Sequence, residues 1–117
     1  MNNLGIVKRN IVRADAKAVD KLSRFGVATI HEAMGRVGLM KPYMRPIYPG
    51  AHICGTAVTV LLHPGDNWMM HVAAEQLEPG DVVIAAITAD CTDGYFGDLL
   101  ATSFQARGAK GLIIDAG

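Results

Sequence analysis

The chain has 117 residues, of which 50% are hydrophobic and 19% are charged, so it can bury the core of one domain. Eleven basic and eleven acidic residues cancel to a formal net charge of +0 without a run of one sign. This balance excludes binding of nucleic acid or of an anionic membrane by bulk electrostatics and favours a small, localised site. We therefore expect a single domain over residues 1–117.

The cysteine usage and the absence of targeting signals indicate a cytoplasmic protein. Cys54 and Cys91 lack CxxC or CxxH spacing, so the sequence predicts no zinc site and favours a reducing compartment. The first residues lack the long apolar core of a signal peptide, and no later stretch is long enough to span a bilayer. We therefore expect no membrane partner.

The first predicted helix is capped by Asp15 and ends at Gly26. Its apolar residues recur at helical spacing, and its charged residues are expected to face outward. The apolar stripe consists of Ala18, Val19, Leu22 and Phe25; the outward residues are Arg13, Lys17, Asp20, Lys21 and Arg24.

A second helix is predicted to open at Thr29, because Thr29 and Glu32 have the spacing of a capping box. Its expected buried face consists of Ile30, Ala33, Met34 and Val37. His31 and Glu32 could form an acid/base pair, but the capping role accounts for Glu32, and partial exposure accounts for His31. The prolines and tyrosines of residues 41–50 then predict an irregular, semi-rigid connection.

A β-branched strand is predicted over residues 55–62, with a turn at 63–66 and a third helix capped by Asp66 or Asn67. The expected face of that helix is Trp68, Met69, Val72, Ala73 and Gln76, with Met70 also taken as core. Asn67 and His71 are four residues apart, so they could share a face and line a pocket near His63. Because this segment has no suitably spaced carboxylate or cysteine, packing or hydrogen bonding explains both histidines better than metal binding does.

The segment most indicative of function is the glycine-rich loop over residues 92–97 and the helix start that follows it. An uninterrupted apolar run at 82–87 predicts a buried parallel strand, and residues 99–107 and 111–114 predict a helix and a further strand, which together make a βαβ unit. Ligands collect beyond the carboxyl ends of such strands. Gly97 would allow close approach, and the amides of Asp98, Leu99 and Leu100 could hold a carboxylate or an enolate oxygen. Asp98 could instead act only as a helix cap.

Several of these stretches resemble the 4-hydroxy-4-methyl-2-oxoglutarate/4-carboxy-4-hydroxy-2-oxoadipate aldolases, the class II pyruvate aldolases of the RraA-like family. The similar stretches are GVATIHEA at 26–33, GTAVTV at 55–60, HPGDN at 63–67 with HVA at 71–73, PGDV at 79–82, GDLLAT at 97–102 and GLIIDAG at 111–117. The resemblance implies a swivelling β/β/α three-layer α/β domain with a central parallel sheet, assembled as homotrimers or hexamers.

The resemblance also implies a function. Family members cleave 4-hydroxy-4-carboxylated 2-oxo acids to pyruvate and a second oxo acid in aromatic-compound degradation, and they decarboxylate oxaloacetate with Mg²⁺ or Mn²⁺. A divalent ion stabilises the pyruvate enolate as a Lewis acid. By resemblance, Gly97, Asp98, Leu99 and Leu100 bind the pyruvyl group, and Asp98 holds metal-bound water.

The chain departs from the family at its end. The resemblance covers about the first half of a family member, and the Arg-Asp pair that supplies the oxyanion-neutralising arginine and the direct metal ligand would begin just past Gly117. We therefore expect a domain truncated at its C-terminus and little or no aldolase activity from these residues alone. Two alternatives stay open: a non-catalytic regulator of ribonuclease E that acts by protein binding, or an inactive fragment. The intact Gly97-Asp98 favours the aldolase.

Overall fold

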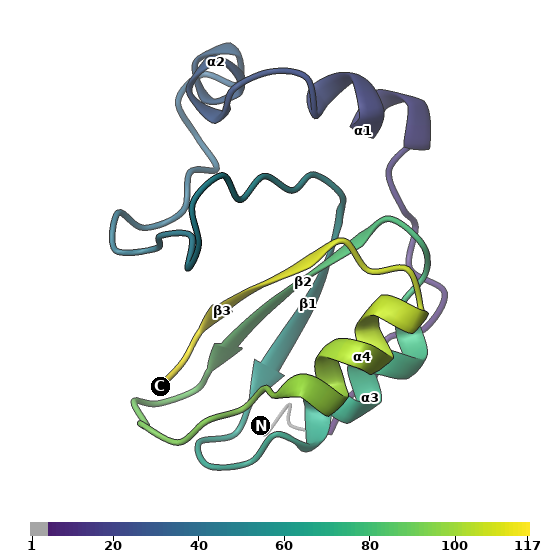
Figure 1. Cartoon of the computed structure of the whole chain (residues 1–117), viewed down its shortest axis with the longest axis vertical. Coiled ribbons are helices and arrows are strands. Elements are labelled where there is room, and N and C mark those ends of the chain that lie inside the picture. Colours follow the sequence, from purple (N-terminus) through teal and green to yellow (C-terminus); the bar gives the residue numbers. More distant parts are fainter. Residues whose placement is uncertain (1–4) are drawn as a thin grey trace.

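The computed structural model describes residues 5–117, which form a parallel three-stranded sheet and four helices. The elements in chain order are α1 (Ala16–Leu22), α2 (Val27–Ala33), β1 (Thr56–Leu62), α3 (Trp68–Gln76), β2 (Asp81–Ile87), α4 (Asp98–Ala106) and β3 (Gly111–Asp115). The strands pair in the order β1-β2-β3, and α3 and α4 lie side by side on one face of the sheet (Figure 1). This confirms the predicted βαβ unit, and it supplies the parallel sheet and the helical layer of the expected α/β architecture.

The core lies between the sheet and the two helices that cover it. In β1 the side chains alternate, with Val58, Val60 and Leu62 buried and the residues between them exposed, as expected of a strand with one covered face. The helices contribute Met70, Ala73, Ala74, Leu100 and Phe104 to the same cluster. Full burial of one large apolar side chain contributes roughly 1.5–3 kcal/mol, so this cluster is the main source of stability.

A close backbone approach fixes where β1 and β2 begin. A Cβ atom added at Gly55 would lie 2.1 Å from the carbonyl oxygen of Gly80, so only glycine fits before β1. The Gly80 N–H in turn donates to the Gly108 carbonyl oxygen at 2.9 Å. Gly108 has φ +85° and follows Arg107, the C-cap of α4. The turns that precede β1, β2 and β3 are therefore tied together at one edge of the sheet.

The prediction of a buried face on the second helix is wrong, and the apolar stripe of the first helix is not buried either. Asp15 does cap α1, because its Oδ2 accepts from the Ala18 N–H at 3.1 Å, but neither α1 nor α2 contains a buried residue. Both helices lie apart from the layer formed by α3 and α4 (Figure 1). An amphipathic pattern shows which face of a helix can be buried. Within residues 5–117, no helix or strand covers the apolar face of α1 or of α2.

Two further expectations need correction. The predicted capping box at Thr29 does not form: α2 begins at Val27 after Gly26, and Glu32 pairs instead with Arg36 at 3.0 Å, one turn further on. Trp68, expected in the core, is 65% exposed, because the side chains that α3 buries are Met70, Ala73 and Ala74. The expectation is confirmed for Met70 and Ala73, whereas Met69, Val72 and Gln76 are half-buried.

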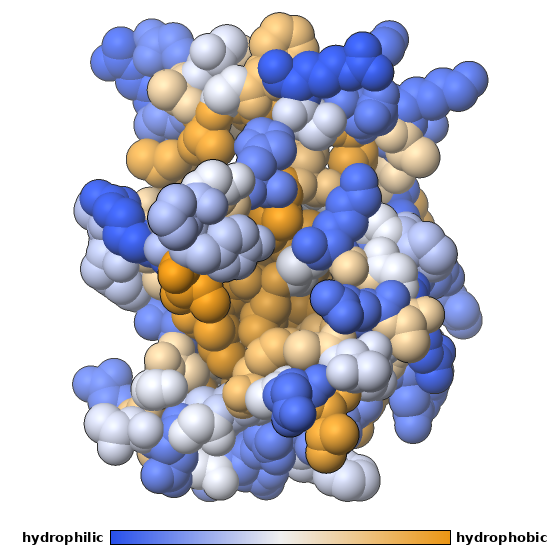
Figure 2. All heavy atoms as spheres, in the orientation of Figure 1, coloured by the Kyte–Doolittle hydropathy of each residue, from blue (hydrophilic) through white to orange (hydrophobic). Residues whose placement is uncertain are grey.

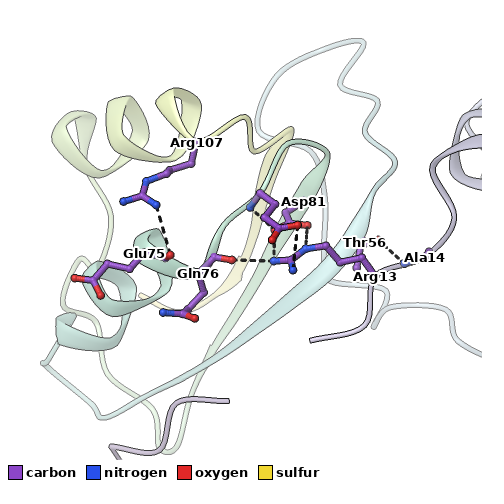
Figure 3. Close-up of polar contacts among 8 residues, drawn as sticks. Arg13, Ala14, Thr56, Glu75, Gln76, Asp81 and Arg107 are labelled. Carbon is purple, nitrogen blue, oxygen red and sulfur yellow. Dashed lines mark hydrogen bonds and ion pairs between the residues drawn. The ribbon is translucent and has the colours of Figure 1, made fainter. Parts of the chain in front are cut away.

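The sequence predicted that Arg13 faces outward on the first helix. Instead, Arg13 joins the N-terminal segment to the sheet (Figure 3). Its Nε and Nη2 donate to the two carboxylate oxygens of Asp81, each at 2.9 Å, and Nη2 also donates to the Gln76 carbonyl oxygen at 2.8 Å. The Asp81 carboxylate is 1% exposed and also accepts from the Glu78 N–H at 2.8 Å. The hydrogen bonds to Asp81 raise the pKa of Arg13 above its ordinary value, and burial opposes them.

None of the helices in the described part of the chain is both long enough and apolar enough to cross a membrane. Apolar surface gathers in the middle of the face seen in Figure 2, where the strands lie in Figure 1, with hydrophilic side chains above and below it.

Candidate functional site

Because the three strands are parallel, their carboxyl ends lie at the same edge of the sheet. Three chain segments follow them at that edge: residues 63–67 after β1, residues 88–97 after β2, and residues 116–117 after β3. The start of α4 lies at the same end (Figure 1). The structure therefore places the predicted Gly97–Leu100 segment where open parallel sheets bind ligands.

The start of α4 presents free backbone donors. The Ala101 N–H donates to the Gly97 carbonyl oxygen at 2.9 Å, which closes the first helical turn, and the Leu99 N–H donates to Asp98 Oδ1 at 3.0 Å. Within residues 5–117, the N–H groups of Asp98 and Leu100 have no partner. Two free amides at the positive end of a helix form a site that favours an anion.

Gly97 leaves room for a ligand beside these amides. Its backbone is extended, with φ −143° and ψ −171°, and a Cβ atom added there would meet nothing within 4 Å. Leu100 is 7% exposed and anchors the turn in the core, whereas Leu99 is 83% exposed and projects outward. The Asp98 side chain is exposed, and one of its oxygens is used by the Leu99 N–H. Leu100 therefore anchors the turn in the core, whereas the side of the turn with Gly97 and Asp98 is open to solvent.

Tyr95 connects the loop after β1 to the loop after β2, a role that the sequence analysis missed. Its side chain is 2% exposed, and its hydroxyl oxygen accepts from the Gly65 N–H at 2.8 Å. The Asn67 side-chain amide donates in turn to the Tyr95 carbonyl oxygen at 3.4 Å. A tyrosine in a glycine-rich loop carries no periodic signal, so only the bulk of this aromatic side chain, between Gly94 and Gly97, could have marked it.

An aromatic contact also holds this loop in place. Phe96 packs on Phe104 of α4, with ring centroids 5.2 Å apart and an interplanar angle of 55°. Asp93 Oδ2 would lie 3.2 Å from a Cβ atom added at Gly65, whose φ is +77°. The pKa of Tyr95 is raised, first by hydrogen bonding with Cys91 and then by burial, while the Gly65 N–H opposes the rise. The hydroxyl therefore stays protonated at neutral pH.

Asn67 and His71 do not face a common pocket. Asn67 turns toward the loop of Tyr95, whereas His71 is exposed and lies beside Trp68, with ring centroids 6.4 Å apart. The helix start is satisfied by Asp66, whose Oδ1 accepts from the Trp68 N–H at 2.8 Å. This supports a hydrogen-bonding role for Asn67 and a packing role for His71.

The described chain offers few direct ligands for a metal ion. No group of three or more histidine, cysteine, aspartate or glutamate side chains within residues 5–117 is arranged to hold one. Asp98 contributes one carboxylate oxygen that is not taken by Leu99, which fits a contact to a metal through water and not a closed protein cage.

The end of β3 is held by a residue from the irregular segment 41–50. The Tyr43 hydroxyl donates to Asp115 Oδ2, and this hydrogen bond is the main cause that raises the pKa of Tyr43. A Cβ atom added at Gly117 would lie 2.4 Å from the Cys91 carbonyl oxygen, so Gly117 packs directly against the loop after β2. The carboxyl edge is thus built from four segments that are distant in the sequence.

Comparisons with known proteins agree with this arrangement. The model of the RraA-like family, described as Aldolase/RraA, matches residues 27–117. A protein from Halalkalibacterium halodurans named "Putative 4-hydroxy-4-methyl-2-oxoglutarate aldolase" is 23% identical over 103 residues. The match covers 88% of this chain and 49% of that relative, so the chain spans about half the length of the curated relative it matches.

Proposed function

The chain belongs to the RraA-like family, and from this premise we propose that it forms part of a divalent-metal-dependent pyruvate aldolase, a lyase that acts on a 2-oxo acid. The name of the Halalkalibacterium halodurans relative supports an aldolase, and the proposed substrates are 4-hydroxy-4-methyl-2-oxoglutarate or 4-carboxy-4-hydroxy-2-oxoadipate. The observation that carries the proposal is the pair of free amides beside the exposed carboxylate of Asp98.

The chemistry requires that negative charge be held as a carbon–carbon bond breaks. Cleavage of the substrate leaves the electron pair on the pyruvyl carbon, so an enolate forms and must be stabilised before it takes up a proton. In the proposed site, the unpaired N–H groups of Asp98 and Leu100 would donate to a carboxylate or enolate oxygen, and the burial of Leu100 and Phe104 anchors the turn that carries them. Preorganised amides of this kind lose little energy to reorganisation.

Asp98 has a second proposed role. Its free carboxylate oxygen would accept a hydrogen bond from a water molecule in the coordination shell of Mg²⁺ or Mn²⁺. When bound, the ion supplies Lewis-acid stabilisation of the developing charge, and it would also support oxaloacetate decarboxylation. Acceptance of the Leu99 N–H and positioning of water are compatible, because the two carboxylate oxygens would serve different partners.

The proposed assembly is a homotrimer or hexamer in the cytoplasm. Support comes from residues 22–48, where large apolar side chains such as Phe25, Val27 and Ile47 are 54%, 65% and 96% exposed. The same surface favours the second candidate function, a non-catalytic regulator that binds another protein. The two differ in the site: only the aldolase requires an anion at Gly97–Leu100.

The test is oxalate binding, because oxalate mimics the pyruvate enolate. We expect amide shifts of Gly97, Asp98 and Leu100 in an NMR titration, and tighter binding when Mg²⁺ or Mn²⁺ is present. Asp98→Asn should remove the metal-dependent gain, and the exposed Asp90→Asn on the same loop is the matched control. A titration without shifts at these amides, with or without metal, would overturn the proposal. Because these residues alone are expected to have little or no aldolase activity, chelator-sensitive oxaloacetate decarboxylation is a second readout for the whole enzyme of which the chain is proposed to form part.

A further inference from the structure

A groove lies beside the outer edge of β1. One wall is the N-terminal segment 5–13, the other is the strand from Ala57 to Leu61, and the floor includes Met69, Val72 and Ala73 of α3. Its volume is about 1210 Å³, above the range of roughly 300–1,000 Å³ typical of sites for small molecules. We name this feature the β1 groove.

The free backbone groups of β1 face this groove. The Thr88 N–H donates to the Leu62 carbonyl oxygen at 3.0 Å, so the backbone groups of Leu62 point toward β2. The direction of the backbone N–H and C=O groups alternates along a strand. The backbone groups of Val58 and Val60 therefore also point toward β2, whereas those of Ala57, Thr59 and Leu61 point outward. Within residues 5–117, no backbone hydrogen bond joins β1 to the segment 5–13, and β1 is the edge of the sheet.

The groove is also polarised. Its lining includes Lys8, Arg9 and Arg107, which form no ion pair within the described residues, whereas Arg13 is neutralised by Asp81 and Glu78. The unpaired acidic group in the lining is Glu75. The Nε2 atom of Gln76, which also lines the groove, is buried and has no partner within the described residues. The groove therefore has an excess of positive charge and a spare hydrogen-bond donor.

We propose that the β1 groove binds an extended polypeptide segment that pairs with β1 and carries acidic residues beside alternating apolar ones. A strand placed there would satisfy the outward groups of Ala57, Thr59 and Leu61, as in other cases of strand addition to a free sheet edge. Its alternate side chains would contact Met69 and Val72 on one side and Leu61 and Ile84 on the other. Its acidic residues would face Lys8 and Arg9, which is the charge complementarity that selects this partner.

The probe is a nine-residue capped peptide that alternates valine and threonine between two terminal aspartates, titrated into the isotope-labelled full chain. We expect the amide N–H groups of Ala57, Thr59 and Leu61 to shift and their exchange with solvent to slow, while those of Val58 and Val60 change little. The same peptide with lysines in place of the aspartates should bind more weakly. Arg9→Glu should weaken binding of the acidic peptide about two- to fivefold.

A proline substitution tests the pairing itself. Thr59→Pro removes an outward N–H and leaves the bonds to β2 intact, so binding should weaken about fivefold, the effect of one backbone hydrogen bond. Thr59→Val keeps the N–H and is the matched control. If Thr59→Pro does not fold, Arg9→Glu and the exchange rates of the unaltered chain still decide.

Three results would overturn the proposal. The first is the absence of shifts at Ala57, Thr59 and Leu61. The second is slow exchange of these amides in the free chain, which would show that residues 5–13 already pair with β1. The third is self-association that depends on β1 and excludes the peptide, which would make the occupant a second copy of this chain.

Discussion

Arg13 and Asp81 are 68 residues apart in the sequence, and two of the guanidinium nitrogens of Arg13 donate to the two oxygens of the Asp81 carboxylate at 2.9 Å. Asp81 is the first residue of β2 and is almost fully buried, so its charge needs this partner. The pair fixes the N-terminal segment against the sheet and thereby sets one wall of the β1 groove.

Arg13→Met should destabilise the chain by about 1–3 kcal/mol, because it leaves the Asp81 carboxylate buried without its counter-charge. The loss should be smaller than the 3–5 kcal/mol typical of a fully buried pair, because the Arg13 side chain is 18% exposed. Urea unfolding measures it. Arg24→Met is the matched control: its pair with Asp20 is exposed on both sides, so a change above about 0.5 kcal/mol there would contradict this reasoning.

Tyr95→Phe should alter the dependence of stability on pH. The folded pKa of Tyr95 lies above its ordinary value of 10.0, so the unfolded chain loses that proton first as the pH rises. The contribution of Tyr95 to the free energy of unfolding is therefore complete below pH 10 and is lost above it. Denaturant unfolding at stepped pH should show the two proteins converging in alkali. Tyr48→Phe changes an exposed tyrosine, so this control should lose stability in alkali as the unaltered chain does. If the stability of Tyr95→Phe ran parallel to that of the unaltered chain at every pH, Tyr95 would not be the source of the alkaline loss.

Gly97→Ala should separate folding from binding. A Cβ atom at this position meets nothing within 4 Å and the φ of −143° suits alanine, so unfolding free energy should change by less than about 1 kcal/mol. The added methyl group projects from the turn that is proposed to contact the ligand, so oxalate affinity should fall about tenfold by calorimetry. Gly26→Ala, equally unhindered and distant from the site, should leave oxalate affinity unchanged. If Gly97→Ala and Gly26→Ala bound oxalate equally well, Gly97 would not belong to the site.

Gly55→Ala should be strongly destabilising. The new Cβ atom would lie 2.1 Å from the Gly80 carbonyl oxygen and 2.9 Å from Val82 Cγ2, so the backbone of β1 or β2 must shift. We expect a loss of about 2–4 kcal/mol in thermal or urea unfolding. The same change at Gly94, where a Cβ atom meets nothing within 4 Å, should cost less than about 1 kcal/mol. Similar losses at both positions would mean that the close approach is not the cause.

The sequence was informative wherever local periodicity and chain order decide the structure. The β-branched residues at 55–62, the apolar run at 82–87 and the helical spacing of the segments between the strands predicted the elements from β1 to β3 to within a residue or two. Because successive parallel strands end at one edge, the place of Gly97–Leu100 also followed from the sequence. The chemical role of these residues stays a proposal.

Tertiary structure alone decided the contacts between distant segments. The Gly65 N–H meets the Tyr95 hydroxyl 30 residues further on, and neither residue belongs to a periodic pattern. The exposed faces of α1 and α2 show the same limit, because a hydrophobic stripe reveals that a helix can be buried but not whether a partner is present. Periodicity therefore determined which residues form strands and helices, while the pairing of buried polar groups and the covering of faces depended on three-dimensional packing.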